Sequence, residues 1–133
     1  MTDRPSGFTI AVVDDDPRIL ESLGWLLESA DHAVRVFASP AAMLESGCLA
    51  EIDCLISDID MPTMDGIELV REVSGARPAL PIILITGHPE MLNRLLSGKA
   101  GPYRSFNKPF DGQELLTAIS EALGNQGPHR RES

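Results

Sequence analysis

The run IDCLISDID at residues 52–60 decides the fold, because in it a short apolar segment ends in an acidic side chain, Asp58. A second run, FTIAVV at residues 8–13, ends in the same way, at the triplet Asp14-Asp15-Asp16. Short apolar runs rich in β-branched residues predict buried strands, so two strands deliver carboxylates to their carboxyl ends. If these strands are parallel neighbours, three or four carboxylates converge, and such a repulsive arrangement persists only with a bound cation or for a function.

Two further candidate strands end in a hydroxyl group and a cation. Thr86 closes the apolar run at residues 82–85, and Lys108 follows a predicted strand at residues 104–107 and precedes Pro109. A hydroxyl and an ammonium group beside carboxylates can neutralise a phosphoryl group during its transfer. The four segments together predict a phosphoryl-transfer site.

The composition bounds the class of protein. The chain has 133 residues, 43% of them hydrophobic, which suffices for one domain with one sizeable core. A formal net charge of −9 predicts that this chain binds neither nucleic acid nor an anionic membrane. Because no apolar stretch approaches the ~18 residues of a membrane span and residues 1–6 lack a signal-peptide core, we expect a cytoplasmic protein. Cys48 and Cys54 lack metal-ligand spacing, so we interpret Cys54 as a core residue.

Strand-like and helix-like segments alternate along the chain. Strands are predicted at residues 8–13, 34–37, 52–57, 82–85 and 104–107. Helices are predicted behind Pro17, after Ser39-Pro40, from a cap at Asp65, around residues 91–96 and around residues 115–123. Strict alternation favours an α/β fold, a doubly wound parallel sheet with helices on both faces, whose ligand site lies at the carboxyl ends of the strands.

Four motifs resemble one known family. VVDDD at 12–16, SDIDMPTMDG at 57–66, ITGH at 85–88 and FNKPF at 106–110 are similar to the receiver domain of bacterial two-component response regulators. The third motif is most similar to receivers of the nitrogen-fixation regulator type. The resemblance implies a flavodoxin-like (βα)5 fold with a five-stranded parallel sheet of order 2-1-3-4-5. It implies a receiver domain at residues 8–124, with an N-terminal extension at 1–7 and a flexible tail at 125–133.

The resemblance assigns a phosphoacceptor and two assisting side chains. Asp58 matches the aspartate that takes a phosphoryl group from a phosphohistidine, and a carboxylate can carry such a group as an acyl phosphate. Lys108 matches the lysine that pairs with a phosphate oxygen, and the Thr86 hydroxyl matches the group that hydrogen-bonds another.

The resemblance also implies a metal site, for Mg²⁺ or alternatively Mn²⁺. Asp15 matches the direct ligand, and Asp14 matches a neighbour that acts through metal-bound water. Asp58 is shared between metal and phosphate, and Asp60 contributes its backbone carbonyl. Oxygen ligands with several retained waters suit Mg²⁺.

The partners implied are a sensor histidine kinase or a phosphotransfer protein, and downstream a protein partner or an output domain. A phosphorylation-dependent dimer is a further expectation. The resemblance also implies that phosphorylation reshapes the face formed by about residues 89–123. The chain is expected to catalyse only its own phosphorylation and slow dephosphorylation, and so not to be an enzyme. No DNA-binding or enzymatic domain follows residue 124, which leaves a stand-alone receiver and a fragment of a longer regulator as alternatives.

Two features keep other functions open. Ser105 stands where many receivers have an aromatic residue three positions before the lysine, so a phosphorylation-independent scaffold is one alternative; Phe106 and Tyr103 are expected to point elsewhere. Asp58-Ile59-Asp60 also resembles the DxD of haloacid dehalogenase-type phosphatases, although Pro62 and the lack of a cap domain argue against them. We interpret Asp65-Gly66 as a structural cap and turn, and His88 as a surface loop residue.

Overall fold

A computed structural model describes residues 8–60, 65–88, 90, 92, 94 and 103–124. Its elements are β1 (Thr9–Val13), α1 (Pro17–Ser29), β2 (Ala33–Phe37), α2 (Pro40–Ser46), the 3₁₀ helix η1 (Cys48–Ala50), β3 (Cys54–Asp58), α3 (Asp65–Ala76), β4 (Ile82–Thr86), β5 (Tyr103–Asn107) and α5 (Gly112–Gly124). The strands form one sheet of order β2-β1-β3-β4-β5, and every neighbouring pair is parallel. The predicted fold class and strand order are therefore confirmed.

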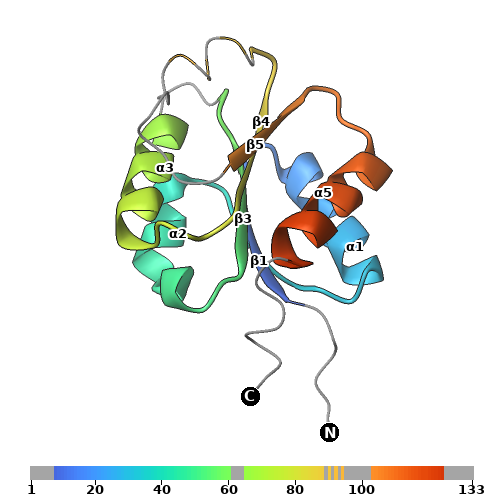
Figure 1. Ribbon diagram of the computed structural model, residues 1–133, viewed down its shortest axis with the longest axis horizontal. Coiled ribbons are helices and arrows are strands. Elements are labelled where there is room, and N and C mark those ends of the chain that lie inside the picture. The colour runs from blue at the N-terminus through green and yellow to red at the C-terminus, as the bar shows by residue number, and fades with distance from the viewer. Residues whose placement is uncertain are drawn as a thin grey trace, which may run out of the picture.

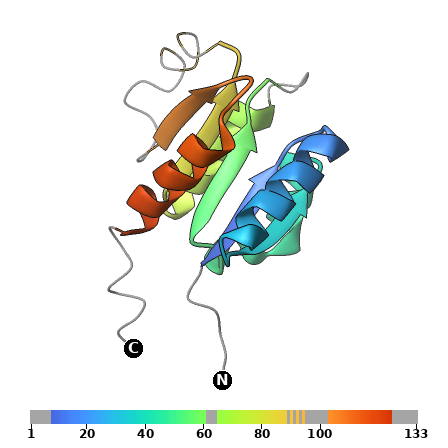
Figure 2. The same cartoon turned by 90° about the vertical axis from the view of Figure 1, so that its right-hand side faces the viewer.

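The sheet separates two hydrophobic cores. Helices α2 and α3 cover one face and α1 and α5 the other, as Figure 1 shows edge-on and Figure 2 shows from the side of α1 and α5. Along β3, Leu55 packs on the side of α2 and α3, whereas Cys54 and Ile56 pack on the side of α1 and α5. Burial on both faces explains why β3 and β4 appear in the sequence as nearly continuous apolar runs rather than alternating ones.

Side-chain caps fix the helices that follow β1 and β2. Asp16 caps α1 by accepting a 2.9 Å hydrogen bond from the Arg18 amide, with Pro17 in the first turn. Ser39 caps α2 through the Ala42 amide at 3.1 Å. Because Asp16 serves as a cap, only two members of the acidic triplet remain for the predicted site.

Several strand boundaries differ from the sequence prediction by one residue, and the start of β3 differs by two. Strand β3 begins at Cys54 rather than at residue 52, because Asp53 turns back to β1: its carboxylate accepts from the Thr9 amide at 2.8 Å, and its own amide donates to the Thr9 carbonyl at 2.7 Å. Ile52 closes the unpredicted helix η1 by donating to the Cys48 carbonyl at 3.1 Å. Helix α3 begins at Asp65, so the expected cap lies within its first turn.

Several predicted segments lie outside the described residues: the extension at 1–7, the loop at 61–64, most of the helix at 91–96, and the tail at 125–133. In the predicted helix, Glu90, Leu92 and Arg94 are described and helical. Within the part of the chain that the structure describes, no helix has the length and apolar character needed to cross a membrane.

Gly66 allows α3 to pack directly on the backbone that follows β3. A Cβ atom at this position would lie 3.0 Å from the Asp58 carbonyl oxygen and 3.1 Å from the Ile59 Cα. Both contacts are to backbone, which cannot move aside without displacing Asp58. The absence of a side chain at Gly66 therefore helps to position Asp58, which supports the structural interpretation of this glycine.

We expect Gly66→Ala to lower the free energy of unfolding by about 1–3 kcal/mol because of this overpacking, even though alanine favours a helix. Gly75→Ala in the same helix is the matched control, since a Cβ there meets no atom within 4 Å. The control should be neutral or stabilising by up to ~1 kcal/mol. Urea unfolding of both variants measures the difference, and equal effects at the two positions would contradict the packing argument.

Candidate phosphoacceptor site

Three carboxylates meet at the carboxyl ends of β1 and β3. The parallel register pairs Val13 with Ser57, so that Asp14 and Asp58 follow on adjacent strands. One carboxylate oxygen from each of Asp14, Asp15 and Asp58 lies within 4.8 Å of the others. The arrangement expected from the sequence is thus present, with Asp14 and Asp58 buried at 3% exposure each and Asp15 exposed.

Asp14 is held at the base of this cluster. Its Oδ1 atom accepts from the Asp16 amide at 2.8 Å, and its own amide donates to the Phe37 carbonyl at 3.1 Å. Burial raises the pKa of Asp14 to about 6, and the charges of Asp58 and Asp15 act in the same direction, while the Asp16 amide and Lys108 oppose them. An ionised Asp14 is therefore costly in the metal-free protein.

Lys108 forms an ion pair with Asp58. Its Nζ atom lies 2.9 Å from Asp58 Oδ1, and its backbone amide donates to the Thr86 carbonyl at 3.2 Å, which fixes the end of β5 beside β4. The Lys108–Pro109 peptide bond is cis. Partial burial alone would lower the pKa of Lys108, but Asp58, and more weakly Asp60, outweigh it and raise this pKa. The ammonium group is therefore charged whenever the site is used.

The two oxygens of Asp58 have different surroundings. Oδ1 accepts from the Lys108 ammonium group and from the Asp60 amide at 3.0 Å. Among the described residues, no hydrogen-bond donor reaches Oδ2. Oδ1 is thus held in place by two donors.

The Asp60 carboxylate lies against the end of β4, a contact that the sequence did not predict. Its Oδ1 accepts from the Thr86 hydroxyl at 2.8 Å, and its Oδ2 accepts from the Gly87 amide at 2.7 Å. Lys108 Nζ lies 3.8 Å from Oδ2, and His88 Nδ1 lies 3.8 Å from Oδ1. Burial alone would raise the pKa of Asp60, but the Gly87 and Thr86 hydrogen bonds, together with Lys108 and His88, more than offset it, so its pKa is lowered. The expectation for Asp60 concerned only its backbone carbonyl, and no sequence signal indicates where a loop side chain turns.

Ser105 lies beside Leu84 in the sheet, where an aromatic residue was expected from the family. Phe106 packs on the opposite face, with α1 and α5, as expected. Tyr103 does not point elsewhere: it packs on the core of α2 and α3, two residues before Ser105 and thus on the same face of β5.

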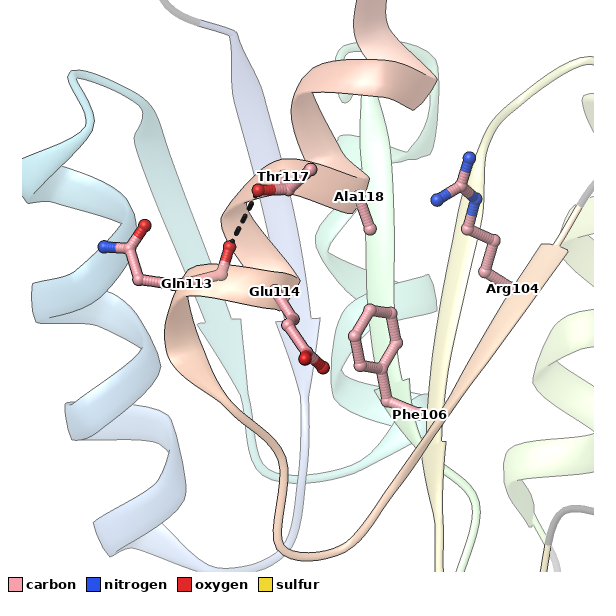
Figure 3. A pocket seen from close by; sticks show the side chains of 6 residues that line it. All are labelled: Arg104, Phe106, Gln113, Glu114, Thr117 and Ala118. Carbon is pink, nitrogen blue, oxygen red and sulfur yellow. Dashed lines mark hydrogen bonds between the residues drawn. The ribbon is translucent and has the colours of Figure 1, made fainter.

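A pocket of about 290 Å³ lies apart from these carboxylates, between β5 and α5. It is lined by Arg104, Phe106, Gln113, Glu114, Thr117 and Ala118 (Figure 3). None of the predicted site residues lines it, so the candidate site is a cluster of side chains at the strand ends rather than this pocket.

The pKa of Asp14 predicts a pH dependence of stability. The folded protein binds a proton at Asp14 up to pH about 6, whereas the unfolded chain releases it near 3.8, so the free energy of unfolding should fall as the pH rises between these values. Asp14→Asn should remove this loss and, without divalent cations, stabilise the protein at pH 7 by up to about 3 kcal/mol. Glu45→Gln, which neutralises an exposed carboxylate, is the control. Urea unfolding at pH 4 and pH 7 in a chelating buffer tests this, and an equal effect of Asp14→Asn at both pH values would contradict it.

Comparison with known proteins agrees with this geometry. The family model for the response regulator receiver domain matches residues 10–120. The transcriptional regulatory protein FixJ of Azorhizobium caulinodans is 32% identical over 96% of this chain and 61% of its own length. The response regulator protein TmoT of Ectopseudomonas mendocina is 36% identical over 100% of this chain and 59% of its own length. The chain therefore spans about three fifths of these two relatives.

A solved structure agrees as well. The signal receiver domain of an HD domain-containing protein from Pseudomonas fluorescens Pf-5 superimposes with a TM-score of 0.81 at 30% identity, over 100% of this chain and 97% of that one. The family match covers β3, nearly all of β1, and β5 with Lys108 directly after it. The chain belongs to the receiver domains of two-component response regulators.

Proposed function

We propose that Asp58 accepts a phosphoryl group from the phosphohistidine of a sensor histidine kinase or phosphotransfer protein. The observation that carries this proposal is the setting of Asp58: a buried carboxylate, paired with Lys108 at 2.9 Å and close to two further carboxylates. Asp14, Asp15 and Asp60 surround the acceptor, but none of these three makes an ion pair as short with Lys108 in the described residues.

In the proposed reaction, an Asp58 oxygen attacks phosphorus and forms an acyl phosphate. The phosphorus–nitrogen bond of the phosphohistidine breaks, and its electron pair stays on the imidazole. Positioning and charge stabilisation provide most of the catalysis in such transfers. Lys108 neutralises charge on one phosphoryl oxygen, and the Thr86 hydroxyl can donate to another after leaving its present partner.

The acidic cluster fits a divalent cation. Its donors are all oxygens, two are buried, and the like charges raise the cost of leaving the site without a counter-ion. Asp15 and Asp58 would hold Mg²⁺ directly, with Asp14 acting through water and Asp60 through its backbone carbonyl; Mn²⁺ would use the same donors. When bound, the cation would offset negative charge on the transferring group.

The receiver domain in this proposal covers residues 8–124, and its only catalysis is its own phosphorylation and slow dephosphorylation. The partners are a histidine kinase or phosphotransfer protein in the cytoplasm, and a downstream protein or output domain. FixJ is by name a transcriptional regulatory protein, and this chain covers 61% of its length. The proposed downstream output is therefore an effect on transcription, exerted through such a partner or output domain.

The two alternative functions are not favoured. A dehalogenase-type phosphatase would carry its aspartate on the first strand, whereas Asp58 ends the third strand in chain order. A phosphorylation-independent scaffold has no need of a buried carboxylate, Asp58, paired with Lys108 beside two other carboxylates. Incubation with acetyl phosphate and Mg²⁺, followed by intact mass, separates the three: one stable phosphoryl group for a receiver, turnover for a phosphatase, no reaction for a scaffold.

Asp58→Asn should abolish labelling by acetyl phosphate, because an amide is a far weaker nucleophile than a carboxylate. Asp111→Asn is the matched control: it also removes one carboxylate but retains the cap of α5 through the Gln113 amide, and it should be labelled like the unmodified protein. Intact mass spectrometry measures both. A label that persists in Asp58→Asn would place the acceptor at another carboxylate.

Mg²⁺ should raise the melting temperature by a few degrees at millimolar concentration, because it binds the folded state and relieves the repulsion among the carboxylates. Asp15→Ala should remove most of this response. The same variant should melt at a higher temperature than the unmodified protein in a chelating buffer, since one of the crowded charges is gone. An unchanged Mg²⁺ titration of Asp15→Ala would exclude direct ligation by Asp15.

A further inference from the structure

The Asp60 carboxylate occupies a set of donors that would suit a phosphoryl group. Two hydrogen bonds hold its oxygens, from the Thr86 hydroxyl at 2.8 Å and from the Gly87 amide at 2.7 Å. Lys108 and His88 supply cationic or potentially cationic nitrogens at 3.8 Å. A hydroxyl, a backbone amide and an ammonium group converging on one anion form the kind of donor set that stabilises phosphate oxygens.

The same donors are needed by the phosphoryl group. Thr86 and Lys108 are the two side chains that the proposed reaction uses, and Asp60 contacts both while lying two residues from the acceptor. The Asp60 amide also donates to Asp58 Oδ1 at 3.0 Å, so the backbone of Asp60 is fixed to the acceptor. A phosphoryl group on Asp58 would therefore be delivered next to an anion that already holds its partners.

We propose that the Asp60 carboxylate mimics the phosphoryl group in the unphosphorylated protein. Asp60 is a positioning residue that keeps Thr86 and Gly87 in their unphosphorylated arrangement until a phosphoryl group displaces its carboxylate. This proposal rests on the proposed function at Asp58. Thr86 is 1% exposed, and its hydroxyl has one proton to donate, so it cannot donate to Asp60 and to a phosphate oxygen at once. Phosphorylation must break the Asp60–Thr86 bond, and the strength of that bond sets part of the cost of activation.

Competition has a distinct energetic signature. Removing Asp60 also removes a negative charge, and that alone would help any anion to bind, whether or not Thr86 is involved. A competition for the Thr86 hydroxyl instead requires coupling between residues 60 and 86. A double-mutant cycle with Thr86→Val, which removes the hydroxyl and keeps the shape, separates the two effects.

The first measurement needs no phosphate. In ¹⁵N-labelled unphosphorylated protein, Asp60→Ala should raise the exchange rate of the Gly87 amide proton at least about fivefold, because that amide loses its acceptor. Asp111→Asn should leave this rate unchanged. An unchanged Gly87 rate in Asp60→Ala would overturn the proposal, since Asp60 would then not be holding this loop.

The second measurement uses the beryllium trifluoride anion, a phosphoryl mimic, with Mg²⁺ present. Asp60→Ala should lower the dissociation constant at least about fivefold relative to the unmodified protein, and the gain should shrink markedly in the Thr86→Val background. Equal gains in both backgrounds would show a general charge effect and overturn the proposal. If Asp60→Ala does not fold, Asp60→Asn is used, with a smaller gain expected in the same direction.

Failure of the proposed function has a different outcome. If the unmodified protein neither binds beryllium trifluoride nor is labelled by acetyl phosphate, Asp58 is not a phosphoacceptor. In that case no phosphoryl group displaces Asp60 either. The Gly87 exchange rate would still decide whether Asp60 holds the end of β4. Labelling at Asp58 together with an unchanged exchange rate would support the proposed function and overturn only the role of Asp60.

Discussion

The parallel pairing of β1 with β3 is the constraint on which the site depends. Because Val13 lies beside Ser57, the residues that follow are two carboxylates at the same buried edge, and neither can move away without breaking the ladder. Among the described residues, four carboxylates, those of Asp14, Asp15, Asp58 and Asp60, stand near one ammonium group, that of Lys108, so they carry three more negative charges than it offsets when all are ionised. Repulsion among these carboxylates lowers the free energy of unfolding, and the burial of the apolar strands offsets that loss.

Each carboxylate relieves the repulsion by a different physical means. Asp14 retains its proton to higher pH, since burial raises its pKa to about 6. Asp58 is neutralised by Lys108, and Asp15 remains in water, where its charge is screened. Asp60 turns away from the cluster and is satisfied by donors at the end of β4. A divalent cation bound by the cluster would offset the charges of Asp14, Asp15 and Asp58 at once. The same cation could then offset the charge of a phosphoryl group at Asp58.

How much of this could be predicted from the sequence depends on the range of the interactions. The strands and their order follow from apolar runs, their alternation with helices and a family resemblance, and the ends of β3 and β4 place Asp58 and Thr86 without any tertiary information. The start of β3 was wrong because Asp53 prefers a hydrogen bond to Thr9, 44 residues away, to a place in the strand. The Asp60 carboxylate could not be placed, because a loop side chain's direction depends on the donors that other segments bring near it. The position of Tyr103, by contrast, could have been predicted. Side chains alternate along a strand, so Tyr103 and Ser105, two residues apart, lie on the same face of β5.

Ser105 offers no aromatic side chain at this position of β5, but hydrogen bonds that begin at Asp60 connect the site to the segment after β4. The Thr86 hydroxyl donates to Asp60 and accepts from the His88 amide at 2.9 Å, and the His88 carbonyl accepts from the Leu92 amide at 3.1 Å. Leu92 is buried in the core formed with α2 and α3, so this chain of bonds joins a carboxylate at the site to a core side chain beyond β4. A shift of the Thr86 hydroxyl toward Asp58 would remove the acceptor of the His88 amide, at the start of the segment that carries Leu92. The bistable element required of a switch can thus consist of backbone bonds around one threonine, with no aromatic side chain that must move between two pockets.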